Sequence, residues 1–132
     1  MIWLNLEYLC ADWAEEYGAV WVICGPVVFG GKPSSWIGDE GEFPVAVPDA
    51  LFKIVVRETS SGFQVLPFIY PQKGEHYKRS SGEDWEYDHT PYLTSVDVIE
   101  AVTGLDFFTS LEDENEAKLE SRIPIELWDV SE

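Results

Sequence analysis

The sequence has few basic residues, and this shortage is its strongest compositional feature. Its 132 residues include 25 acidic side chains and only 8 basic ones, which gives a formal net charge of −17 at pH 7. Such a surface repels nucleic acid and anionic membranes and attracts cations and basic partners. A bound divalent metal together with a local basic strip can offset the field, so a nucleic-acid ligand is not excluded. Acidity that serves only solubility is an equally open interpretation.

Cysteines and long apolar runs are also scarce. Two cysteines, Cys10 and Cys24, make neither a disulfide framework nor a zinc site, and we expect both to be buried thiols. No segment approaches the roughly 20 apolar residues of a membrane span, and the start lacks the basic region of a signal peptide. With 45% hydrophobic and 14% aromatic residues, the composition predicts one folded domain over residues 1–132.

Apolar residues at intervals of three and four predict an amphipathic helix over residues 3–17. Gly18 can adopt the left-handed conformation that ends a helix. The next apolar run, from Val20 to Cys24, predicts an interior strand that leads into a Gly25-Pro26 turn. The apolar stripe of the helix consists of Trp3, Leu6, Cys10, Trp13 and Tyr17.

Alternating residues predict an antiparallel hairpin with strands at 52–58 and 63–70. In the first strand, Phe52, Ile54 and Val56 point to one face and Lys53, Val55 and Arg57 to the other. Residues 29–43 are rich in Gly, Pro and Ser and predict a loop, which a brief extended piece at 45–47 follows. Residues 71–91 predict a long polar loop, which in a small domain is usually functional or mobile.

A second helix is predicted to follow Thr94 or Ser95 as its cap and to end at Gly104. Its expected buried face consists of Val98, Ile99 and Val102. Ser110 and Asp113 open a last helix, and the tail around Trp128 is expected to return to the core. The order of elements predicts an α+β fold in which helices flank an antiparallel or mixed sheet.

Four segments, taken in order, resemble the DNA/RNA non-specific endonuclease family. They read V-W-V-I-C-G-P-V at 20–27, V-A-V-P-D-A-L-F-K-I-V-V at 45–56, F-I-Y-P-Q at 68–72 and T-S-V-D-V-I-E-A-V-T-G-L-D-F-F at 94–108. The resemblance implies a ββα-metal (His-Me finger) fold. It also implies cleavage of phosphodiester bonds with one hydrated ion of the Mg²⁺ or Mn²⁺ type.

The family's chemistry uses a histidine base in a D-R-G-H motif and a metal-binding asparagine in an N-x-x-x-W-x-x-L-E pattern. W-L-N-L-E at 3–7 matches the end of that pattern. Trp3 takes the position of its tryptophan, Leu6 that of its leucine and Glu7 that of its glutamate. The asparagine would precede Met1, and D-R-G-H would lie further upstream. We therefore expect the C-terminal part of such a nuclease, without the N-terminal finger portion and inactive alone.

Glu7 is the site residue that the resemblance carries over, with a catalytic role that it could exert through a metal-bound water. A solvated glutamate is the alternative. Asn5 does not replace the missing asparagine, because its spacing to Trp3 is wrong. Ala11 stands where family members often carry arginine. No primary metal ligand is assigned within this sequence.

The basic residues form one cluster, Lys73, Lys78 and Arg79, which we expect to follow a nucleic-acid backbone. Charges that merely decorate a loop are the alternative. Lys53 and Arg57 share a strand face and form either a second small patch or pairs with surface acids.

Both histidines, His76 and His89, lie in the long polar loop, where exposure is expected and a catalytic role is not favoured. The acids Asp84, Glu86 and Asp88, like Asp39, Glu40 and Glu42, match no established metal loop. The acidic run at 112–120 predicts a solvated helix face.

Two further expectations concern partners. If the finger portion is missing, the helix face near Glu7 is left open as a groove, or a second copy of the chain covers it as a homodimer. The alternative function is a noncatalytic acidic module that binds a basic protein. No membrane partner is expected.

Overall fold

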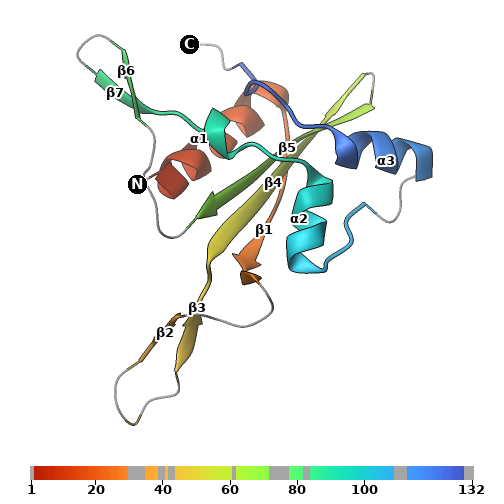
Figure 1. Ribbon diagram of the computed structural model, residues 1–132. Coiled ribbons are helices and arrows are strands. Elements are labelled where there is room, and N and C mark those ends of the chain that lie inside the picture. The colour runs from red at the N-terminus through yellow and green to blue at the C-terminus, as the bar shows by residue number, and fades with distance from the viewer. Residues whose placement is uncertain are drawn as a thin grey trace.

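The computed structural model describes residues 2–29, 35–38, 41, 44–60, 62–71, 78–81, 84–108 and 113–129. Three helices and seven strands lie in this part of the chain, which confirms the α+β class (Figure 1). None of the described helices is long and apolar enough to cross a membrane. The elements are α1 (Ile2–Tyr17), β1 (Trp21–Val27), β2 (Ser35–Ile37), β3 (Val45–Val47), β4 (Ala50–Thr59), β5 (Gly62–Pro71), β6 (Lys78–Ser81), β7 (Asp84–Tyr87), a 3₁₀ turn (Thr90–Tyr92), α2 (Val96–Thr103) and α3 (Asp113–Ser121).

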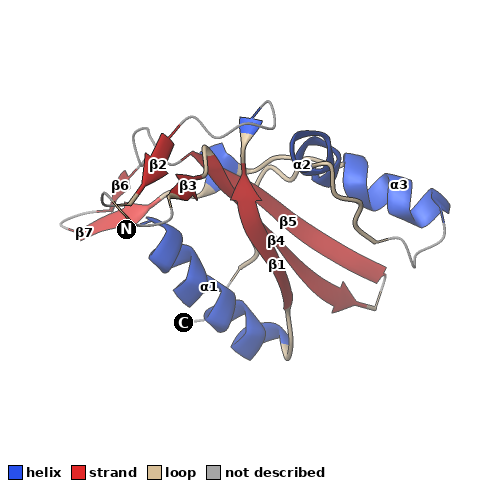
Figure 2. Ribbon diagram, turned by 90° about the horizontal axis from the view of Figure 1, so that it is seen from below, coloured by secondary structure: helices blue, strands red, loops and turns tan. Residues whose placement is uncertain are grey.

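The main sheet is antiparallel and has the strand order β1-β4-β5. Helix α1 lies on one face of this sheet, and α2 and α3 lie on the other (Figure 2). The predicted hairpin is confirmed as β4 and β5, which pair from Ala50 opposite Pro71 to Thr59 opposite Gly62. Strand β4 is therefore the central strand, and both of its faces are covered.

The predicted alternation along β4 decides which residues enter which core. Val55 packs under α1, whereas Phe52 and Ile54 pack toward α2. All three are at most 2% exposed. Burial of large apolar side chains contributes about 1.5–3 kcal/mol each, so this two-sided packing is the main source of stability.

Strand β1 differs from the predicted interior strand. It is an edge strand, and Trp21 and Val22 are 52% and 43% exposed. Trp21 lies opposite Val56, on the α2 face, and Val22 lies opposite Val55, on the α1 face, so this end of the strand is only partly covered on both faces. Gly25 and Pro26 lie within the strand and do not form a turn. A side chain at Gly25 would begin only 2.9 Å from the ring of Phe52, so glycine allows that ring to pack against the strand.

Two short strand pairs lie outside the main sheet. Strands β2, β6 and β7 fall in segments that were predicted to be loops, whereas β3 confirms the brief extended piece predicted at 45–47. Strand β2 pairs with β3, and β6 pairs with β7. Each of these strands has only three or four residues. So few positions give almost no alternation of apolar and polar side chains, and the periodicity on which strand prediction depends is absent.

Helix α2 begins and ends as predicted. The Ser95 hydroxyl accepts a hydrogen bond from the Val98 amide at 3.2 Å, and Gly104 ends the helix with φ +75°. The predicted buried face is rotated: Val98 is 42% exposed, whereas Val96 is fully buried beside Ile99. The cap residue therefore supplies the correct start, but Val96 occupies the place in the core that was expected for Val98.

The C-terminal segment returns to the core, as predicted. The Trp13 indole N–H donates to the Trp128 carbonyl at 3.0 Å, and the ring centroids of Trp13 and Trp128 are 5.3 Å apart. The Tyr17 hydroxyl donates to the Asp129 carbonyl. Ser110, which was expected to open the last helix together with Asp113, lies outside the described residues, and α3 begins at Asp113.

The cap of α2 can be tested with neighbouring substitutions. We expect Ser95→Ala to lower the free energy of unfolding by about 1 kcal/mol, because the Val98 amide loses its acceptor. Thr94→Ala should change it by less than about 0.5 kcal/mol. Urea unfolding of both variants measures the difference. Equal losses at both positions would contradict the assignment of Ser95 as the cap.

Candidate functional site

Glu7 projects from the exposed side of α1, on the turn next to the buried stripe. Leu6 and Cys10 are buried against the sheet, while Glu7 itself is exposed. Leu4 and Tyr8, which lie beside it, are 43% and 65% exposed. The carboxylate is thus accessible, and apolar surface surrounds it. The open groove on this face, or its coverage by a second copy of the chain, stays a prediction.

A buried lysine lies behind this part of α1. Lys53 is only 4% exposed, and its ammonium group is 4.2 Å from the centre of the Trp3 ring. Burial raises the pKa of the Cys10 thiol, while Lys53 lowers it and Glu7 raises it, so both charged groups lie near Cys10. The predicted surface patch at Lys53 is wrong, because β4 carries this residue under α1, where the indole ring stabilises its charge.

The thiols differ from one another. Both are free, but only Cys10 is buried, whereas Cys24 is exposed. Cys24 lies on the edge strand β1, opposite Lys53 in the strand register. The expectation of two buried thiols is therefore wrong for Cys24, because it lies on an edge strand whose outer side no other strand covers among the described residues.

His89 is buried, contrary to the prediction of an exposed loop histidine. It is 1% exposed, and both ring nitrogens make hydrogen bonds. Nδ1 is 2.8 Å from the Tyr70 hydroxyl, and Nε2 is 2.6 Å from the Asn5 side-chain oxygen. His89 thus joins α1 to β5 through side chains that are 84 and 19 residues away in sequence.

The partners determine the protonation state of His89. The amide oxygen of Asn5 can only accept, so Nε2 donates and Nδ1 accepts from the Tyr70 hydroxyl. Burial lowers the pKa of His89 to about 4, against the opposing effect of Asp88. Burial also raises the pKa of Tyr70. His89 is therefore neutral near pH 7, and neither ring nitrogen is open to a substrate, so its role is structural.

The stability of the fold should depend on the pH through His89. Its pKa is about 4 when folded and about 6.5 when unfolded, so the unfolded chain takes up the proton first as the pH falls. The contribution of neutral His89 to the free energy of unfolding is complete above about pH 6.5 and decreases by about 3 kcal/mol as the pH falls toward 4. We expect His89→Gln to be less stable than the wild type near pH 7 and to show a flatter dependence on pH.

Urea unfolding across this pH range measures the effect. His76→Gln, which also removes one imidazole, is the matched control. The slope of its free energy of unfolding against pH should equal that of the wild type. Parallel slopes for the wild type and His89→Gln would contradict the burial of a neutral His89.

Arg57 lies between two aromatic rings, near the C-terminal end of α1. Its guanidinium is 4.2 Å from the Tyr17 ring centre and 4.4 Å from that of Trp128. Its Nε–H donates to the Gln64 side-chain oxygen at 2.9 Å. Arg57 was predicted to form a surface patch or to pair with surface acids, but it makes these contacts instead. The contact with Trp128 exists because the C-terminal segment returns to the core.

A cluster of carboxylates lies on the opposite side of the sheet, between α2 and α3. Oxygens of Asp97, Glu100 and Glu120 all lie within 4.8 Å of one another. Glu100 also accepts a hydrogen bond from the Phe107 amide at 2.9 Å, and burial raises the pKa of Glu100. Glu120 is 7% exposed, which corrects the prediction of a solvated face for this end of the acidic run.

This cluster was not among the sites predicted from the sequence. Asp97 and Glu100 are three residues apart and so share a face of α2, which is the one signal that was available. Glu120 joins them only because α3 packs beside α2. Three carboxylates offer the oxygen ligands that Mg²⁺ and Mn²⁺ prefer.

The cluster and Glu7 lie on different sides of the sheet. Among the described residues, no group of three potential ligands includes Glu7. The described residues around Glu7 therefore do not form a metal site by themselves.

The proposed basic cluster falls mostly outside the part of the chain that can be described. Lys78 and Arg79 lie on β6, but the positions of their side chains, like all of Lys73, are outside the described residues. His76 and the candidate acids at 39–42 are outside them as well, as are the side chains at 84 and 86. Asp88 accepts hydrogen bonds from the amide and hydroxyl of Thr90, which gives it a role in the turn.

Comparison with known proteins gives a consistent family match. Residues 1–114 match the family model described as DNA/RNA non-specific endonuclease. The chain is 27% identical over 118 residues to the mitochondrial nuclease EXOG of Danio rerio, covering 83% of this chain and 32% of that protein. It is 26% identical over 121 residues to a nuclease of a Nostoc species, covering 92% and 42%, respectively. The human mitochondrial nuclease EXOG is 26% identical over 119 residues, covering 83% and 30%. The chain thus spans between about a third and two fifths of the length of these relatives.

Proposed function

The chain belongs to the DNA/RNA non-specific endonuclease family, and from this membership we propose that it forms part of a nuclease that hydrolyses phosphodiester bonds. The family match carries this proposal, because residues 1–114 include α1, the whole main sheet and α2. We further propose that residues 1–132 belong to one domain. The proposed nuclease acts on nucleic acid, with an ion of the Mg²⁺ or Mn²⁺ type as its cofactor.

The proposed role of this chain is to supply the scaffold and Glu7. The exposed position of Glu7 on α1 supports a role near bound nucleic acid or a metal-bound water. Lys73, Lys78 and Arg79 are proposed to contact the phosphate backbone, because cations there would offset the net charge of −17. When bound, the ion would stabilise negative charge on the phosphate.

These 132 residues contain no D-R-G-H motif, and the metal-binding asparagine of the family pattern would precede Met1. His89 cannot serve in place of the missing base in this fold, since Tyr70 and Asn5 occupy its nitrogens. We therefore propose that the chain alone hydrolyses little or no nucleic acid.

A plasmid-cleavage assay with Mg²⁺ or Mn²⁺ tests this proposal. We expect the purified chain to cut no faster than a buffer control with the same ion. Wild type, Glu7→Ala and His76→Ala should then be indistinguishable. Robust cutting that either substitution abolishes would show that the chain holds a complete site and would contradict the proposal.

The second candidate is a noncatalytic module that binds a basic protein. The acidic composition favours it, since 25 acids face only 8 bases in the whole chain. Capture of a basic partner that is lost at high salt, combined with absent cleavage, would support this function. Absence of any basic partner would count against it.

A further inference from the structure

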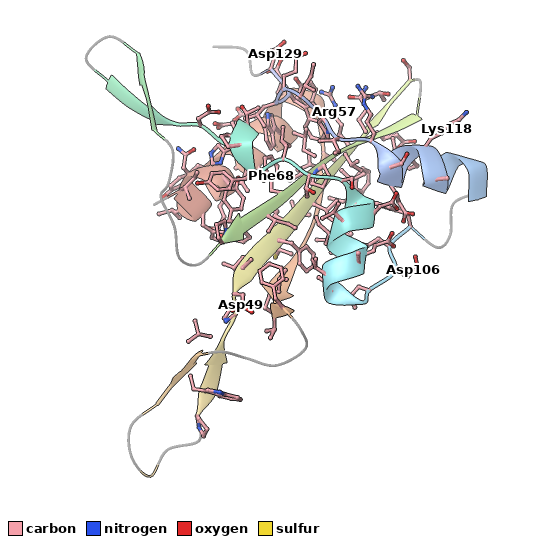
Figure 3. The ribbon with its side chains drawn as sticks, in the orientation of Figure 1. Asp49, Arg57, Phe68, Asp106, Lys118 and Asp129 are labelled. Atoms are coloured by element: carbon pink, nitrogen blue, oxygen red, sulfur yellow. The ribbon has the colours of Figure 1, made fainter. Side chains whose placement is uncertain are left out.

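A groove lies at the end of the sheet far from Glu7, between β5, α3 and the C-terminal segment. Its volume is about 800 Å³, within the range of roughly 300–1,000 Å³ that is usual for protein ligand sites. Figure 3 shows Arg57, Lys118 and Asp129, which line it from three different parts of the chain. The proposed nuclease function does not use this groove.

The groove follows the edge of β5. Successive side chains of a strand point to opposite faces, so a cavity above one face would contact only alternate residues. Here all five residues from Gly62 to Leu66 line the groove. On one side it is bounded by Leu119 of α3, and on the other by Tyr17 of α1. The groove therefore runs along the outer edge of the strand.

That edge has hydrogen-bonding groups to offer. Among the described residues, the backbone of 62–66 pairs only with β4. Beyond this stretch, residues 93 and 94 occupy the edge of β5 that faces away from β4. The Thr94 amide donates to the Pro67 carbonyl at 3.0 Å, and Phe68 pairs with Leu93. An edge that alternates amide donors and carbonyl acceptors matches an extended peptide, whereas a phosphate backbone can only accept.

The charge of the groove is unlike that of the rest of the chain. Three of the eight basic side chains line it, Arg57, Lys118 and Arg122, but only two of the 25 acids do, Glu126 and Asp129. Arg122 is exposed at the surface of this region. The local excess of cations favours an acidic ligand in a chain that otherwise repels one.

The groove also presents apolar surface. Ile125 and Phe63, which line it, are 85% and 43% exposed. A ligand that places apolar side chains on these residues and carboxylates near Arg122 would satisfy both features. Alternating side chains of an extended segment provide that combination, because neighbouring residues point in opposite directions.

We propose that this groove binds an extended acidic peptide segment of another protein, which adds as a strand to the open edge of β5. The backbone of the segment pairs with residues 62–66, its apolar side chains contact Phe63 and Ile125, and its carboxylates face Arg122. This site is separate from Glu7 and requires neither metal nor nucleic acid.

Fluorescence anisotropy tests the proposal with a labelled hexapeptide of alternating valine and glutamate, in buffer with EDTA. We expect saturable binding to the whole chain. Three further probes should bind at least about tenfold more weakly: the valine–lysine counterpart, the acidic peptide N-methylated at alternate backbone amides, and oligothymidylate. The methylated peptide keeps its side chains but cannot pair fully with a strand edge.

Protein variants complete the experiment. Arg122→Glu should weaken binding of the acidic peptide at least about tenfold, and Ile125→Ser should weaken it by about threefold or more. Ile123→Ser is the matched control, because Ile123 is also exposed, at 58%, but does not line the groove. All three positions are exposed, and thermal unfolding verifies that the variants fold.

Several results would overturn the proposal. They are the absence of saturable binding, equal binding of the acidic and basic peptides, no effect of backbone methylation, or equal losses at Ile123 and Ile125. Tighter binding of oligothymidylate that Arg122→Glu weakens would instead identify a nucleic-acid groove. None of these results depends on whether the chain cleaves nucleic acid.

Discussion

The α1 side of this fold depends on the buried hydrogen bonds that link Asn5, His89 and Tyr70. These residues come from α1, from the segment after β7 and from β5, and they meet where water does not reach the His89 ring. Buried polar groups without partners are costly, so the three segments have little freedom to shift against one another. The same bonds hold the first turns of α1 in place and, with them, the outward position of Glu7.

The central strand β4 imposes the second constraint, because both of its faces must be covered. Helix α1 covers the face that carries Lys53 and Arg57, and both cations lie over aromatic rings. Helix α2 covers the opposite face, where α3 completes the carboxylate cluster. Edge strand β1 and the first half of β5 are left more open, so the candidate interaction surfaces lie at the edges of the sheet and on the outer face of α1.

Much of this architecture follows from local signals, but the sites do not. Helical periodicity over 3–17, alternation along β4 and β5, and the cap at Ser95 each predict an element that the structure contains. The burial of His89 could not be predicted in this way, because its partners lie 84 and 19 residues away. Glu120 is buried for the same kind of reason, through the packing of α3 beside α2. The resemblance to the endonuclease family, by contrast, depends only on contiguous sequence segments and needs no long-range contact. The family match confirms it.

In this account, His89 is a neutral structural residue that fixes α1, and the chain contributes a scaffold to the proposed nuclease chemistry. Long-range ¹H–¹⁵N NMR of the imidazole nitrogens tests this claim most directly. We predict that His89 carries its proton on Nε2, remains neutral from about pH 7 to about pH 5, and titrates only near pH 4. A proton on Nδ1, or titration near the ordinary value of 6.5, would contradict the account.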